Sequence, residues 1–180
     1  SKRSEIYLIY IQKYNIKISK IIYYSKNKQN LYKAIERKNL LKKTLFVRSN
    51  TINSPLIEKA ILQISDDIPT IFSGYSGEII KNKIFLKINL IHFHPGDLPS
   101  YKGSTTIFYS LILEKKITVT CFRMTGKIDE GEILYKKNFK KPNKLNQINH
   151  LYDHRIRAET MIEFLKNGKK KYKVKNKSKK

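Results

Sequence analysis

The stretch His92-Phe93-His94-Pro95-Gly96-Asp97-Leu98-Pro99, followed by Tyr101-Lys102-Gly103-Ser104-Thr105-Thr106, carries the most information about the fold. Two histidines one residue apart end an apolar run that predicts a buried strand over 88–92, and a loop rich in proline and glycine follows. Ser104 or Thr105 can then cap a helix. A second loop, residues 127–131, brings Asp129 later in the chain. Two imidazoles and a carboxylate near strand ends are the components of an acid/base site.

Strand and helix patterns alternate along the rest of the chain. The spacing of apolar residues predicts strands over 18–24, 44–48, 69–73, 117–122 and 133–139, and helices over 25–37, 55–64, 105–112 and 143–165. Ser54 is placed to cap a helix with Pro55 at its first position. Residues 78–85 fit a short helix or turn, and residues 6–11 fit either a strand or a helix. This alternation predicts an α/β domain with a mostly parallel sheet, in which ligands bind beyond the carboxyl ends of the strands.

Length and composition predict one domain over 1–167 and a disordered lysine-rich tail over 168–180. The chain has 180 residues and a formal net charge of +24, which favours anionic partners, although AT-rich codon usage would also enrich lysine, isoleucine and asparagine. Cys121 is the one cysteine, so an intramolecular disulfide is excluded and a reducing cytoplasm is expected. No apolar stretch approaches the roughly 20 residues of a membrane helix.

The three titratable residues fit the transfer of a formyl group to an amine. Such an amine must lose a proton, for which a histidine near neutral pKa is suited. A carboxylate can hold the tautomer of that histidine, and a further donor must face the developing oxyanion. We assign these roles to His94, Asp129 and His92 in that order.

The segment 92–106, joined to Ile128-Asp129-Glu130-Gly131-Glu132-Ile133-Leu134, resembles the core of the folate-dependent formyltransferase family. The resemblance implies a Rossmann-like three-layer fold, 10-formyltetrahydrofolate as formyl donor and an amine acceptor. By position, His94 matches the catalytic histidine of the family and Asp129 its catalytic aspartate. His92 stands where the family has its catalytic asparagine, and Gly96 where it has a serine.

The same resemblance implies binding residues and one departure from the family pattern. The donor site would use Ser73, Gly74, Tyr75, Ile80, Thr125, Gly126, Lys127 and Ile128. The acceptor site would use Tyr101, Lys102, Gly103, Ser104 and Thr105. The family also begins with a strand at the centre of the sheet, which is missing here or is replaced by residues 6–11. Without such a strand, two neighbouring strands would have unpaired edges.

The segment 153–161 resembles a motif of formyltransferase-like proteins of sugar modification, so we expect a small anionic acceptor, a nucleotide-linked amino sugar. Glycinamide ribonucleotide is a weaker option. The alternatives left open are an inactive or truncated relative that binds nucleic acid through its lysines, and a metal site of His92, His94 and Asp129. His150 and His154 share a helix face and are expected to be packing or surface residues. The oligomeric state is left open, with a homodimer as one option.

Overall fold

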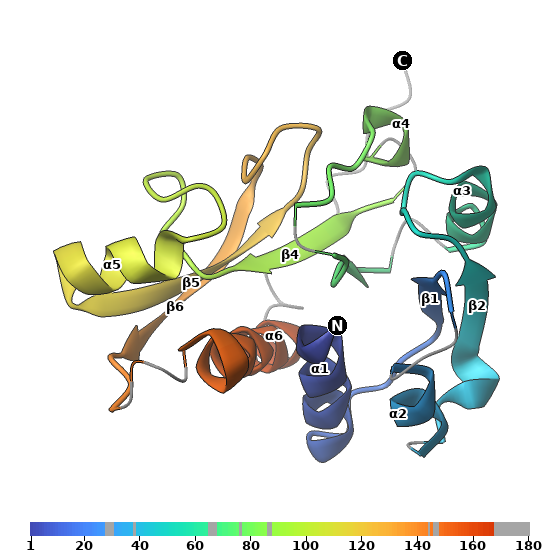
Figure 1. Cartoon of the computed structure of the whole chain (residues 1–180), viewed down its shortest axis with the longest axis horizontal. Coiled ribbons are helices and arrows are strands. Elements are labelled where there is room, and N and C mark those ends of the chain that lie inside the picture. Colours follow the sequence, from blue (N-terminus) through green and yellow to red (C-terminus); the bar gives the residue numbers. More distant parts are fainter. Residues whose placement is uncertain are drawn as a thin grey trace.

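The strands of the protein form two separate sheets, as the computed structural model in Figure 1 shows. The structure describes residues 1–27, 31–37, 39–64, 68–75, 77–85, 88–143, 145 and 148–167, so the predicted tail lies outside the described residues. The first sheet pairs β1 (Ile21–Ser25) and β2 (Thr44–Arg48) in parallel. The second has the order β3 (Thr70–Ile71), β4 (Leu90–His94), β5 (Lys116–Arg123) and β6 (Ile133–Lys140). In this sheet β3 and β4 are parallel, whereas β5 joins both of its neighbours antiparallel.

Helices separate most of these strands, which confirms the predicted α/β class. They are α1 (Lys2–Lys13), α2 (Leu31–Arg37), α3 (Pro55–Ile61), α4 (Asn82–Phe85), α5 (Thr106–Glu114) and α6 (Asp153–Asn167), with short turns η1 (Leu41–Lys43) and η3 (Ile148–Tyr152). The predicted cap of α3 is present, because Ser54 Oγ accepts a hydrogen bond from the backbone N–H of Ile57 and Pro55 is the first helical residue.

The helices decide one open expectation and correct another. Residues 6–11, which fit either a strand or a helix by sequence, belong to α1, and Tyr7 and Leu8 are buried on this helix. The helix predicted over 143–165 is interrupted: η3 is a π-helical turn, and regular α-helical geometry begins only at Asp153.

Strand β4 is buried on both faces and separates two apolar clusters. Ile91 and Phe93 pack with residues of α1, α5 and α6, and Leu90 packs on the other side with residues of α3 and α4. Because side chains alternate along a strand, His92 points away from Ile91 and Phe93 and lies on the same side as Leu90. The strand therefore fixes the direction of its two histidines through the burial of its apolar neighbours.

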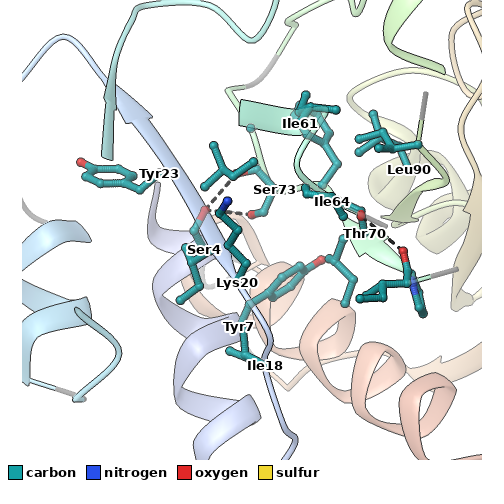
Figure 2. Close-up of a pocket in the computed structure, with 18 of the residues that line it drawn as sticks. Ser4, Tyr7, Ile18, Lys20, Tyr23, Ile61, Ile64, Thr70, Ser73 and Leu90 are labelled. Carbon is teal, nitrogen blue, oxygen red and sulfur yellow. Dashed lines mark hydrogen bonds between the residues drawn. The ribbon is translucent and has the colours of Figure 1, made fainter. Parts of the chain in front are cut away.

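The facing edges of β1 and β3 are separated by an apolar cavity of about 570 Å³, which we call the slot (Figure 2). α1 covers one side of the slot with Ser4 and Tyr7, and α3 lines it with Ile61. The backbone N–H groups of Thr70 and Phe72 donate to the carbonyl oxygens of Asn89 and Ile91, so by strand alternation the N–H of Ile71 points toward the slot. Among the described strands, none pairs with these two edges of β1 and β3, as expected.

Candidate active site

His94, at the end of β4, is fixed through one of its two ring nitrogens. Its Nε2 lies 2.9 Å from the carbonyl oxygen of Tyr101 and 3.2 Å from Thr106 Oγ1. Since a carbonyl oxygen only accepts, Nε2 carries the proton and the neutral ring keeps a lone pair on Nδ1. Burial lowers the pKa of His94, although the carboxylate of Asp129 and the Tyr101 carbonyl act in the opposite direction. The ring is therefore held neutral with a basic nitrogen free.

Asp129 faces that basic nitrogen. Its Oδ2 lies 3.6 Å from His94 Nδ1 and accepts a 2.8 Å hydrogen bond from the backbone N–H of Gly103. The φ of Asp129 is 48°, in the left-handed region that aspartate tolerates better than most residues. Gly131 supports this tight loop, because a Cβ there would lie 1.8 Å from the carbonyl oxygen of Arg123. The structure thus brings together the imidazole and the carboxylate that the sequence pairs.

His92 lies on the same face of β4 as His94. It makes its hydrogen bond through Nδ1, whereas His94 uses Nε2. Its Nδ1 is 3.3 Å from the carbonyl oxygen of Phe72, and its ring meets the ring of Phe122 edge-on at 6.0 Å. Burial lowers the pKa of His92 well below its ordinary value, and the charges of Arg157 and Arg3 add to this effect. His92 is consequently a neutral imidazole.

A cavity of about 230 Å³, which we call the histidine cavity, is lined by His92, His94 and Asp129. Other predicted binding residues also line it: Tyr75, Ile80, Gly103, Ser104, Thr125, Gly126, Lys127 and Ile128. Five predicted residues do not: Ser73, Gly74, Tyr101, Lys102 and Thr105. Ser73 and Gly74 line the slot, and Lys102 Nζ binds Glu130 Oε1 at 2.7 Å on the surface.

Two arginines that the sequence analysis did not single out also line the histidine cavity. Arg157 donates from Nε to Asp153 Oδ1 at 2.8 Å and from Nη1 to the carbonyl oxygen of Phe93 at 3.0 Å. Arg3 donates from Nη2 to the carbonyl oxygen of Gly74 at 2.8 Å. The spacing of Asp153 and Arg157 by four residues in a helical segment is a sequence signal for their pairing. No comparable signal connects Arg3 with β4.

The loop after β4 is positioned by Thr120 and depends on a glycine. Thr120 Oγ1 donates to the carbonyl oxygen of Gly96 at 2.6 Å and accepts from the backbone N–H of Leu98. A Cβ at position 96 would lie 2.7 Å from His94 Nε2 and 2.8 Å from the carbonyl oxygen of Tyr101. The missing side chain of Gly96 therefore leaves the space in which His94 Nε2 and the Tyr101 carbonyl oxygen form their hydrogen bond.

Neither a metal cluster nor a membrane-spanning helix is found in the described part of the chain. No group of three or more histidine, cysteine, aspartate or glutamate side chains there is arranged to hold a metal ion. In the same residues, no helix is long and apolar enough to cross a bilayer. His154 is paired with Asp153, with 3.3 Å between Nδ1 and Oδ2. The side chain of His150 is not among those that the structure describes.

Comparisons of sequence find formyltransferases, although no family model matches the chain. Methionyl-tRNA formyltransferase of Rickettsia bellii is 31% identical over 84 residues, which is 45% of this chain and 27% of that protein. The bifunctional polymyxin resistance protein ArnA of Wigglesworthia glossinidia brevipalpis is 31% identical over 112 residues, which is 61% of this chain and 17% of that protein. The match thus spans 27% or less of the length of these curated relatives.

Solved structures show the same family at the level of fold. Phosphoribosylglycinamide formyltransferase from Anaplasma phagocytophilum matches with a TM-score of 0.65 and 18% identity, covering 97% of this chain and 85% of that one. A sugar N-formyltransferase from Shewanella matches with a TM-score of 0.59 and 18% identity, covering 98% and 68%. The fold is therefore the Rossmann-like fold of formyltransferases, as predicted. Together with the sequence matches, it shows that this chain is related to the formyltransferase family.

Proposed function

We propose that the protein transfers a formyl group from 10-formyltetrahydrofolate to a primary amine. The observation that carries this proposal is the arrangement of His94 and Asp129, with Nδ1 and Oδ2 3.6 Å apart and Nε2 of the histidine fixed on a carbonyl oxygen. Both facing atoms are acceptors when the imidazole is neutral, so an N–H group placed between them satisfies both. An amine that must lose a proton has that group.

In this reaction His94 is the general base and Asp129 its partner. His94 Nδ1 takes a proton from the amine that attacks the formyl carbon, and the ring becomes an imidazolium that donates to Asp129 Oδ2. When the bond between the formyl carbon and the donor nitrogen breaks, the imidazolium returns this proton to that nitrogen, and tetrahydrofolate is released. Asp129 stabilises that cation while the backbone N–H of Gly103 keeps the carboxylate in place. The bond from Nε2 to the Tyr101 carbonyl prevents the ring from turning.

The histidine cavity fits one end of the folate donor. Its volume of about 230 Å³ is below the range of roughly 300–1,000 Å³ that is usual for whole ligands, so it suits a ring system and the formyl group rather than the entire molecule. Ile80 and Phe85 are among its apolar lining residues, and residues 125–128 also line it. The donor supplies an electrophilic formyl carbon, and the chain supplies orientation and the base.

For the acceptor, we propose a small anionic amine, with a nucleotide-linked amino sugar as the first choice. The similarity of the fold to that of a sugar N-formyltransferase supports this choice, as does the strongly basic charge of the chain. Arg3 and Arg157 border the histidine cavity and add local positive charge. A small acceptor is consistent with the size of the cavity.

The test is formation of tetrahydrofolate from 10-formyltetrahydrofolate over a panel of nucleotide-linked amino sugars and simple amines. His94→Ala is expected to lower turnover by several orders of magnitude, and Asp129→Asn to lower it strongly. Ile112→Ala, on the exposed side of α5, is the matched control and is expected to keep full turnover. Near-normal turnover of the folded His94→Ala protein would refute the assignment.

The second candidate is an inactive relative that binds nucleic acid, which the net charge of +24 favours. Binding through phosphates weakens steeply as salt concentration rises and is independent of His94. Salt-sensitive binding of an RNA or DNA duplex, together with absence of turnover over the whole panel, would support this alternative over formyl transfer.

A further inference from the structure

The tautomer of His92 is fixed by its surroundings. Nδ1 lies within hydrogen-bonding distance of the Phe72 carbonyl oxygen, which only accepts, so Nδ1 carries a proton. In the neutral ring Nε2 then has a lone pair and no hydrogen. A donor role of His92 toward an oxyanion, as the sequence predicts, requires a second proton on this ring.

The charges around His92 oppose that second proton. Arg157 on α6 and Arg3 on α1 act on the ring from the side of the helices, and His94 on β4 lies next to it. Glu78, Lys127 and Asp129 also line the cavity, but Glu78 is occupied by Tyr24 and Ile52, and Asp129 by Gly103. Burial is the largest cause of the lowered pKa of His92, and the guanidinium groups of Arg157 and Arg3 add to it.

We propose that His92 is a hydrogen-bond acceptor, through Nε2, for an N–H group of the acceptor amine, and that Arg157 is a positioning residue that preserves this role. The proposal rests on the proposed function for the identity of the ligand. Arg157 is itself fixed by Asp153 on one side and by the Phe93 carbonyl, between the two histidines, on the other. His92 and His94 then present two lone pairs to one cavity, which suits a group with more than one N–H, a primary amine.

The tautomer is tested by ¹⁵N NMR of histidine-labelled full-length protein without any ligand. The spectrum of His92→Asn identifies the His92 signals. At neutral pH we expect a protonated Nδ1 and a bare Nε2 in His92, and the ring is expected to stay neutral at pH values where an ordinary histidine is already protonated. A protonated Nε2 at neutral pH would overturn the proposal.

The role of Arg157 is tested by the titration of His92 in variants. Arg157→Met is expected to raise the pKa of His92, and Arg157→Lys to keep it low. Arg155→Met removes a cation of the same helix that pairs with Glu159 on the surface, and is the matched control with no expected change. If Arg157→Met does not fold, Arg157→Met combined with Asp153→Asn removes the stranded carboxylate. An unchanged titration in either folded variant would overturn the role of Arg157.

The kinetic effect of His92→Leu separates an acceptor from a donor. Loss of one hydrogen bond to the amine is expected to raise KM for the amine about 3- to 10-fold with a modest effect on kcat. Loss of an oxyanion donor would lower kcat about 10²- to 10³-fold and leave KM for the amine unchanged, which would overturn the acceptor role. The NMR result stands without turnover, so absence of activity would refute the proposed function and not the tautomer.

Discussion

Asp153→Asn is expected to destabilise the protein through the Asp153–Arg157 pair. Burial alone would raise the pKa of Asp153, but His154 and Arg157 outweigh it and hold the pKa at about 2. Against an ordinary value of about 3.9, this difference corresponds to about 2–3 kcal/mol of stability at neutral pH. The side chain of Asp153 is only 12% exposed, so screening by solvent is small. The variant also leaves Arg157 without its anion, and the expected loss at pH 7 is therefore about 2–4 kcal/mol.

The lowered pKa of Asp153 also determines how the stability difference between the two proteins changes with pH. A carboxyl with a lowered folded-state pKa stabilises the protein above its unfolded pKa, and that stability disappears as the pH falls through the folded value. The difference between the wild type and Asp153→Asn is expected to be constant from pH 7 to about 5 and to shrink between about pH 4 and 2. Urea unfolding followed by circular dichroism at several pH values measures it.

The matched control is Glu159→Gln, which removes a partly exposed ion pair with Arg155 two residues further along α6. Its effect is expected to stay within about 0.5 kcal/mol at every pH. A loss below about 0.5 kcal/mol in Asp153→Asn, or a loss that does not change with pH, would show that the pair does not stabilise the fold as its geometry indicates.

Three further predictions follow from the packing of the site and the core. Gly96→Ala is expected to displace the His94 ring and to cost about 1–3 kcal/mol of stability, measured by urea unfolding, and an unchanged His94 ¹⁵N spectrum with unchanged stability would contradict it. The amide hydrogen of Ile71, which faces the slot, is expected to exchange with solvent much faster than that of Phe72, which donates to Ile91; equal protection in NMR exchange would show that the slot edge is paired. Burial raises the pKa of the Cys121 thiol, so it is expected to react with a thiol reagent only after unfolding, and rapid labelling of the native protein would contradict this.

The sequence was sufficient to predict the pairing of His94 with Asp129, because both follow strong local signals. His94 ends an apolar run and Asp129 lies in a loop with glycine, so each could be placed near a strand end. Arg3 could not be predicted, because its place beside β4 results from how α1 packs against the sheet. The bond of Asp153 with Arg157 was visible as a helical spacing, but its position beneath the histidines depends on where α6 crosses β4.

Local propensity is not sufficient where tertiary packing decides. The composition of residues 6–11 left a strand and a helix both open, and in the structure they are helical, with Tyr7 packed edge-on against Phe93 in the core formed with α6. The start of α6 was misplaced by several residues, since the apolar spacing continues through the π-helical turn. That two strand edges would lack a partner was anticipated only through the resemblance to a family with a strand at the centre of its sheet, and the sequence did not identify them as β1 and β3.

The measurement that tests the central claim most directly is thermal unfolding of the protein with and without 5-formyltetrahydrofolate, a stable analogue of the proposed donor. A ligand that binds only the folded state raises the melting temperature with the logarithm of its concentration over Kd. The proposed function predicts a clear, saturable rise. Cooperative unfolding at the same temperature over the whole concentration range would contradict the presence of a folate site.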